Sequence, residues 1–119
     1  MINLSFNVDI NCLEVGSDLT GSCIWIPDTQ NQEKSPTTLT IGWRTDGKGD
    51  KDEEIIYKTE LKSSVRTYFQ CRIPVAGPVS YNGQLLKIIW EITVFTSNLL
   101  IFSETLKTQV IHVIPRQKR

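Results

Sequence analysis

Alanine is almost missing from this sequence of 119 residues. It occurs once, at Ala76, whereas Ile, Val and Thr together number 34. Alanine is the strongest helix former, while β-branched side chains lose rotamer freedom in helices and pack well on pleated sheets. The composition therefore excludes a helical protein and predicts an all-β fold.

Net charge and long apolar runs are also missing. The 13 Lys and Arg residues balance 13 Asp and Glu residues, and no apolar run approaches the roughly 20 residues that a membrane-spanning helix needs. The length is that of one small soluble domain with a single core. We expect this domain to occupy residues 1–115, followed by a short basic tail at 116–119, with no transmembrane segment.

The chain ends indicate a location and exclude one class of partner. Residues 1–6 lack the basic and apolar regions of a secretory signal, which favours a cytoplasmic protein. Residues 1–33 contain no Lys or Arg, and residues 116–119 hold three of the cations. So short a basic tail is typical of a frayed, solubilising end, and we expect no nucleic-acid binding.

The cysteines Cys12, Cys23 and Cys71 are odd in number and lack the spacing of a metal site or redox motif. Free cysteine behaves as a small buried apolar residue, so we expect three reduced, buried thiols. One disulfide between Cys12 and Cys23 is the alternative.

Apolar and polar residues alternate along most of the chain, as they do in half-buried strands. Strands are expected at residues 2–10, 19–26, 38–45, 54–61, 65–73, 85–96 and 99–114, the last being one bent strand or two pieces, with the bend at 103–104. Short strands spaced by about 12 residues and joined by Gly/Pro loops predict an immunoglobulin-like antiparallel β-sandwich of seven to eight strands.

The predicted strand at 85–96 is apolar on both faces. One face is continuously apolar, and the other carries Ile89 and Phe95 among charged residues. Either the strand is central and locally covered, or something packs on its outside. Because exposed apolar patches mark interaction sites, Ile89 and Phe95 are the predicted interaction surface.

The segment 74–83 contains two prolines and two glycines and is predicted to turn the chain sharply or to cross between sheets. Pro74, Pro78, Tyr81 and Gly83 are its predicted structural residues. We expect Tyr81 to hydrogen-bond upstream backbone, as in a tyrosine corner, rather than to contact a ligand.

These features together resemble the arrestin-like domain. The resemblance lies in Gly16 to Gly21 with the strand 22–25, the corner at 74–83 and the strand 88–92. Trp43-Arg44-Thr45 and the loop 47–50 look closest to bacterial single-domain arrestin-like proteins. The resemblance implies a non-catalytic scaffold or adaptor that binds a protein partner or itself, without a cofactor. Eukaryotic arrestins pair two such domains around a polar core, a role that passes to no residue here.

The loop at 46–52 carries Asp46, Asp50 and Asp52 and is the weak candidate for a metal site. An EF-hand starting at Asp46 fails, because Lys51 stands where glycine is needed and Tyr57 where the bidentate carboxylate is needed. We therefore expect a solvated loop. Calcium or other ligand binding through this loop is the alternative function.

No catalytic constellation appears in the sequence. His112 is the single histidine, and a lone histidine forms neither a triad nor an ordinary zinc site. We expect His112 to be structural and Trp25, Trp43 and Trp90 to pack in the core. The sequence predicts that the protein is not an enzyme.

Overall fold

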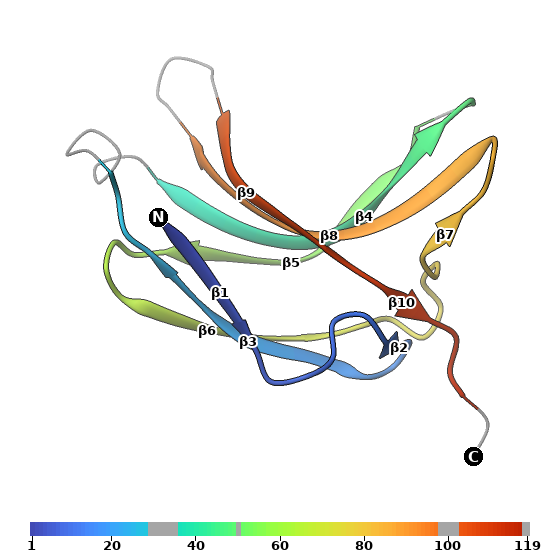
Figure 1. Cartoon of the computed structure of the whole chain (residues 1–119), viewed down its shortest axis with the longest axis horizontal. Coiled ribbons are helices and arrows are strands. Elements are labelled where there is room, and N and C mark those ends of the chain that lie inside the picture. The colour runs from blue at the N-terminus through green and yellow to red at the C-terminus, as the bar shows by residue number, and fades with distance from the viewer. Residues whose placement is uncertain (29–35, 50, 98–102, 118–119) are drawn as a thin grey trace.

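Two facing β-sheets make up the structure, which is a computed structural model that describes residues 1–28, 36–49, 51–97 and 103–117 (Figure 1). One sheet contains, in spatial order, β1 (Ile2–Phe6), β3 (Asp18–Trp25) and β6 (Arg66–Arg72). The other contains β5 (Glu53–Leu61), β4 (Thr37–Gly47) and β8 (Leu86–Ser97), with β7 (Tyr81–Asn82) and β9 (Ser103–Ile111) both beside the far edge of β8. The predicted all-β sandwich is confirmed.

All strand pairs within the two sheets are antiparallel. One further pair of short strands, outside these sheets, is parallel. β10 (Val113–Ile114) pairs with β2 (Leu13–Glu14) in parallel, which the purely antiparallel prediction missed. The described chain therefore has ten strands, of which β2, β7 and β10 have two residues each. No helix in the described residues is long and apolar enough to cross a membrane.

The core lies between the sheets and follows the alternation of the strands. On β8, Trp90, Ile92 and Val94 are fully buried, while the residues between them face outward. On β3 and β6 the same alternation buries Cys23, Phe69 and Cys71. Trp25 and Trp90 are core residues as predicted, and Trp43 is half-buried against the core.

The first strand is shorter than its alternation predicts. β1 ends at Phe6, and the ladder to β3 closes with the Asn7 N–H donating to the Thr20 carbonyl at 3.1 Å. Val8 and Ile10 still pack against the core. Alternation thus reports which side chains face the core, and it continues where the backbone has lost its strand partner.

The last predicted strand is interrupted at a different place. Ser103 and Glu104 begin β9 rather than bend it, and the break falls at His112, between β9 and β10. The His112 N–H donates to the Ile10 carbonyl at 2.8 Å, and its carbonyl accepts from the Leu13 N–H at 2.9 Å. His112 marks the point where the chain changes partner from β8 to β2. Residues 99–102 of the predicted strand lie outside the described residues.

Candidate interaction surface

The predicted surface residues Ile89 and Phe95 lie on the outward face of β8, and both are half-buried. β8 is central, because β4 pairs along one edge and β7 and β9 along the other. The two residues are six positions apart, or about 20 Å along a strand. Between them the Arg44 guanidinium binds the Glu91 carboxylate at 2.9 Å. The two side chains therefore do not form one patch.

A groove forms beside Ile89, where the edge of β8 changes partner. Pairing with β9 ends at Trp90 opposite Ile111, and pairing with β7 begins at Ile88 opposite Tyr81. Between these two pairs, β7 and β9 diverge from the strand that they share. The result is an open groove of about 270 Å³ along β8.

The groove has an apolar floor and a polar rim. Ile89 and Val110 supply aliphatic surface on the outward face, while Ile88 faces the core beside them, and the rim carries both charged and neutral polar groups. The full lining consists of Ser80, Tyr81, Asn82, Lys87, Ile88, Ile89, Trp90, Val110, Ile111 and His112. No carboxylate or thiol occurs among these lining residues, and the basic groups among them are Lys87 and His112.

The end of the groove next to Ser80 is held by residues 73–80, the crossing segment that connects β6 to β7. The Ser80 N–H donates to the Val113 carbonyl, and the Ser80 hydroxyl accepts from the Val113 N–H, both at 2.8 Å. The Trp90 indole N–H donates to the Pro78 carbonyl at 3.0 Å. These bonds tie the crossing segment to the core and to β10, so the walls of the groove are held in place.

Tyr81 does not form the predicted tyrosine corner. Its side chain is 56% exposed, and its hydroxyl donates to no described residue. The ring instead lies over Gly83, where an added Cβ would come within 2.5 Å of a ring carbon. Pro74 and Pro78 lie in the crossing segment, which Ser80 and Trp90 anchor in place of the tyrosine. Tyr81 is therefore available at the groove.

His112 contributes to the groove by its side chain and to the fold by its backbone. The neighbours Ile111 and Val113 are buried, so alternation turns the exposed His112 side chain outward, beside Val110. Lys87 and Asn82 are paired across β7 and β8 and face the same side. The sequence analysis did not select Asn82, Lys87, Val110 or His112, because only the pairing register brings them together.

The acidic loop does not assemble a metal site in the described residues. Asp46 belongs to the end of β4, and Asp52 is fixed by its backbone, whose N–H donates to the Thr45 hydroxyl at 2.8 Å. Both side chains are exposed, and Asp50 lies outside the described residues. Nowhere in the described chain do three His, Cys, Asp or Glu residues come together to hold a metal. Ligand binding by this loop stays a prediction.

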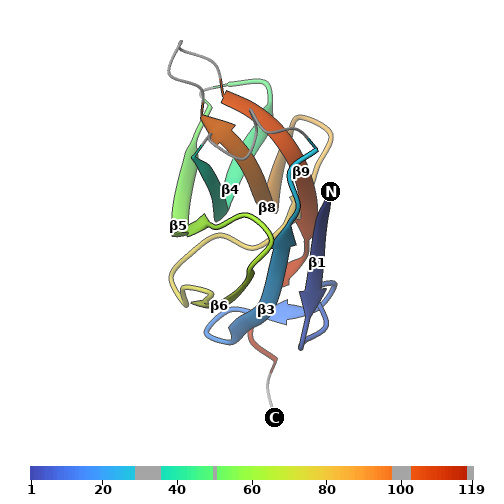
Figure 2. The ribbon, with the colours of Figure 1, turned by 90° about the vertical axis from the view of Figure 1, so that its left-hand side faces the viewer.

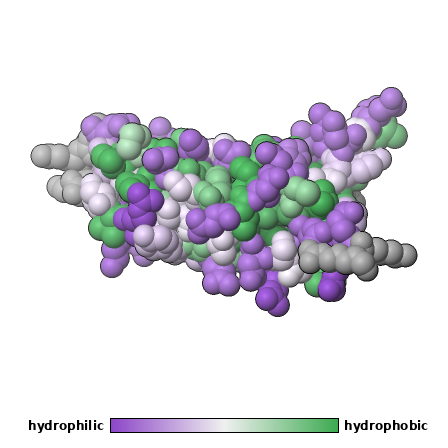
Figure 3. Space-filling model, turned by 60° about the horizontal axis from the view of Figure 1, so that its bottom comes forward, coloured by the Kyte–Doolittle hydropathy of each residue, from purple (hydrophilic) through white to green (hydrophobic). Residues whose placement is uncertain are grey.

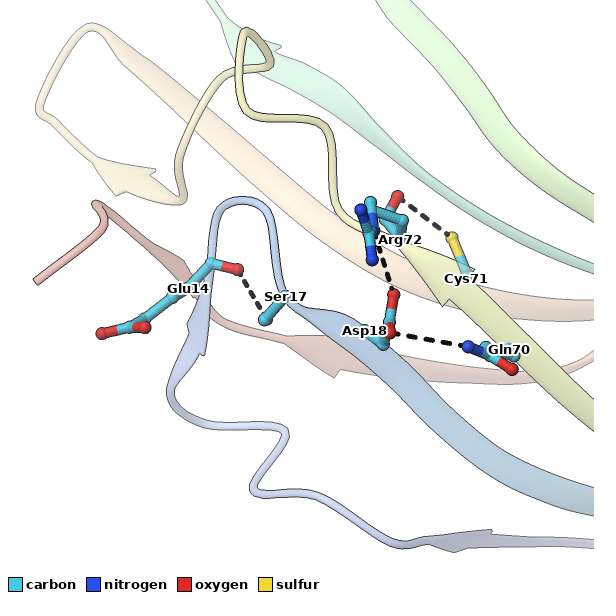
Figure 4. Close-up of polar contacts among 6 residues, drawn as sticks. All are labelled: Glu14, Ser17, Asp18, Gln70, Cys71 and Arg72. Carbon is cyan, nitrogen blue, oxygen red and sulfur yellow. Dashed lines mark hydrogen bonds and ion pairs between the residues drawn. The ribbon is translucent and has the colours of Figure 1, made fainter.

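A second polar cluster surrounds the start of β3 (Figure 4). The Ser17 hydroxyl donates to the Glu14 carbonyl at 2.6 Å, and the Asp18 carboxylate accepts from Gln70 at 3.5 Å and from Arg72 at 3.3 Å. These contacts close the turn between β2 and β3 and join β3 to β6. The Glu14 carboxylate accepts from the Gln117 N–H at 3.3 Å, so the cluster also holds the chain after β10.

All three cysteines are free thiols in the structure, and two of them are buried. Cys23 and Cys71 lie in the core as predicted, but Cys12 is exposed, because it follows the turn that ends the first alternating segment. Burial raises the pKa of the Cys71 thiol from 9.0 to about 11, with a further contribution from Asp18. Burial also raises the pKa of Cys23, and Lys107 opposes that shift.

We expect a thiol reagent at pH 8 to modify Cys12 rapidly and Cys23 and Cys71 only on unfolding, because the thiolate is the reactive form.

Above pH 9 the unfolded Cys71 thiol ionises while the folded one stays neutral. Its contribution to stability is therefore complete below pH 9 and declines toward pH 11, by up to about 1.4 kcal/mol per pH unit. Urea unfolding of the wild type and of Cys71→Ala from pH 8 to 11 checks the change in stability. Counts of reactive thiols with and without denaturant check the difference in reactivity. Three equally fast thiols in the native protein would contradict it.

The outer face of the three-stranded sheet has no single apolar patch in the described residues. A cavity of about 780 Å³ at the start of β3 and the end of β6 is lined mostly by polar and charged residues, among them Glu14, Arg72 and Arg116. Hydrophilic and hydrophobic residues are interspersed over this side rather than gathered in one patch (Figure 3). Its side chains are linked by polar contacts, such as that from Arg66 to the Ser22 hydroxyl at 2.9 Å. The groove on β8 is therefore the better candidate for recognition.

Comparison with known proteins identifies the fold. The sequence matches no protein-family model and no curated protein. Among solved structures it is similar to Spo0M, a sporulation control protein from Bacillus subtilis, with a TM-score of 0.55 and 12% identity. The match covers 94% of this chain and 48% of that one, so the chain spans about half of its structural neighbour. Spo0M has an arrestin-like fold, and at this identity the likeness extends to the fold alone: this chain folds as an arrestin-like β-sandwich.

Proposed function

We propose that this chain is a non-catalytic protein-binding domain of the arrestin-like type, acting as a scaffold or adaptor in the cytoplasm. The observation that carries this proposal is the groove between β7 and β9, with its aliphatic floor at Ile89 and Val110 and its polar rim. Interaction sites combine an apolar centre with a polar rim in this way. Spo0M is a sporulation control protein, which agrees with a regulatory role for this chain.

The lining indicates the chemistry of the partner. Tyr81 presents an exposed ring, and Lys87 and His112 are the basic groups of a rim that has no carboxylate. A volume of about 270 Å³ suits one or two side chains rather than a folded surface. The partner segment is therefore expected to insert an aliphatic or aromatic side chain next to an Asp or Glu.

The test compares partner capture by groove variants of the tagged chain in the cells that produce it. Ile89→Asp places a charge on the apolar floor, and Lys87→Glu reverses the charge of the rim. Both should reduce capture of the partner, and binding of the purified partner, at least about tenfold, since hot-spot residues contribute about 2 kcal/mol or more. Capture is quantified by mass spectrometry and binding by calorimetry.

Tyr68→Asp is the matched control. Tyr68 is exposed on β6, in the other sheet, and the same change of charge there should leave capture unaltered. Circular dichroism would confirm that each variant is folded. Partners retained equally by Ile89→Asp, Lys87→Glu and the wild type would refute the groove as the binding site.

A further inference from the structure

The edge strand β5 carries a second recognition surface, remote from the groove. β5 pairs with β4 along one edge and with no strand in the described part of the chain along the other. It lies at the left-hand edge of its sheet, and β9 lies at the opposite edge (Figure 2). An unpaired strand edge is a template for another strand, so its side chains decide whether a partner is accepted or refused.

The regular part of β5 is short and has a definite centre. Its pairing with β4 is uninterrupted from Leu61 opposite Thr37 to Tyr57 opposite Ile41, and then a bulge at Ile56 shifts the register. Five residues, 57–61, therefore form a regular edge, and Thr59 is their midpoint.

This segment is complementary to itself. When two copies pair antiparallel about a two-fold axis at Thr59, Lys58 of each lies opposite Glu60 of the other. Both side chains are exposed on the outward face, where their own neighbours across the sheet are Thr40 and Thr38, which are uncharged. The pairing would form two intermolecular ion pairs and would set Tyr57 of each copy opposite Leu61 of the other on the inward face.

The other long edges lack this property. On the regular part of β9, residues 107–111, the same two-fold pairing would place Lys107 opposite the uncharged Ile111. The same operation on β6, which is regular over Arg66–Arg72, would place Arg66 opposite Arg72 and bring like charges together. On β1 it would pair Asn3 with Ser5, and no charged residue occurs in that strand. The charge pattern therefore selects β5.

We infer that two copies of this chain associate through antiparallel pairing of β5 over residues 57–61, centred on Thr59, with Lys58 and Glu60 in reciprocal ion pairs. β4 and β8 separate this edge from β7 and β9, so self-association leaves the groove open. The interface is small, and it forms a weak dimer that presents two grooves to a partner. The inference depends on the β5 edge and not on what the groove binds.

Charge reversal tests the proposed dimer, because in a two-fold interface each substitution changes both of the Lys58–Glu60 ion pairs. In K58E the introduced carboxylate of each copy faces Glu60 of the other, and in E60K the introduced amine of each copy faces Lys58 of the other. Each change turns two attractive pairs into two repulsive ones and should raise the dimer dissociation constant by about tenfold or more. Sedimentation equilibrium up to about 500 µM protein, in about 0.1 M salt so that exposed charges are incompletely screened, measures the constant.

Two rescues separate pairing from loss of fold. The double variant K58E/E60K restores opposite charges and should dimerise like the wild type, and an equimolar mixture of the two single variants should form a heterodimer. Ile89→Asp, in the groove, should leave the dissociation constant unchanged. A wild-type chain that stays monomeric at the highest concentration, or single variants that dimerise as well as the wild type, would overturn the inference.

Discussion

Trp90→Ala should lower the free energy of unfolding by about 3–5 kcal/mol, the range for truncating a large buried aromatic residue. Trp90 is fully buried and lies on the central strand β8, with core residues on both sides of it. The substitution leaves a cavity between the sheets. It also removes the donor to the Pro78 carbonyl, which Trp90 binds at 3.0 Å. Urea unfolding followed by circular dichroism measures the change.

Trp90→Phe divides this effect into its two causes. Phenylalanine keeps a six-membered ring and loses the indole N–H, so it should cost about 1–3 kcal/mol, the penalty for a half-buried acceptor that loses its donor together with a smaller void. Trp43→Ala is the comparison at a half-buried tryptophan, where the loss should be smaller. If Trp90→Ala unfolded at nearly the same urea concentration as the wild type, the sandwich would not depend on this side chain.

The core was predictable because burial follows a period of two along each strand. Alternation in the sequence places Trp90, Ile92 and Cys71 inward, and the structure agrees. The same period explains the error at the first strand, since Val8 and Ile10 keep facing the core after the ladder has ended. Side-chain pattern is a local property of the sequence, whereas a strand also requires a partner.

The candidate site was only partly predictable, because it arises where the edge of one strand changes partner. The apolar character of Ile89 was visible in the sequence. Its association with Lys87, Tyr81 and His112 depends on the register of β8 with β7 and β9. Nothing in the alternation indicates that one strand edge is shared by two different strands, so the groove had no signature in the sequence.

A glycine in the first sheet shows the same dependence on register. Gly21 on β3 lies opposite Phe6 on β1 and Phe69 on β6, on the face turned to the core. The two phenylalanine rings pack edge to face over it, with centroids 6.3 Å apart and an interplanar angle of 69°. A Cβ at this position would lie 2.8 Å from the Phe69 ring and against the Ser5 carbonyl. The absence of a side chain is thus what allows the rings to meet.

Gly21→Val should therefore destabilise the protein at the upper end of the range of about 1–3 kcal/mol found for overpacked cores, and Gly21→Ala by less. Near-ultraviolet circular dichroism should change as well, because the ring pair is displaced. Gly77→Ala is the matched control, since a Cβ there meets its nearest atoms at 3.5 Å and should change stability by less than about 0.5 kcal/mol.

The cause can be located with a second substitution. Phe69→Leu makes room for the new methyl groups, so it should cost less in the Gly21→Val background than in the wild type, with a coupling energy of about 0.5 kcal/mol or more. The contact with the Ser5 carbonyl is a backbone contact, which Phe69→Leu cannot relieve, so the double variant should remain less stable than Phe69→Leu alone. Strictly additive losses would mean that the ring does not limit the space at Gly21, and that the close approach of β1 to β3 is the sole constraint.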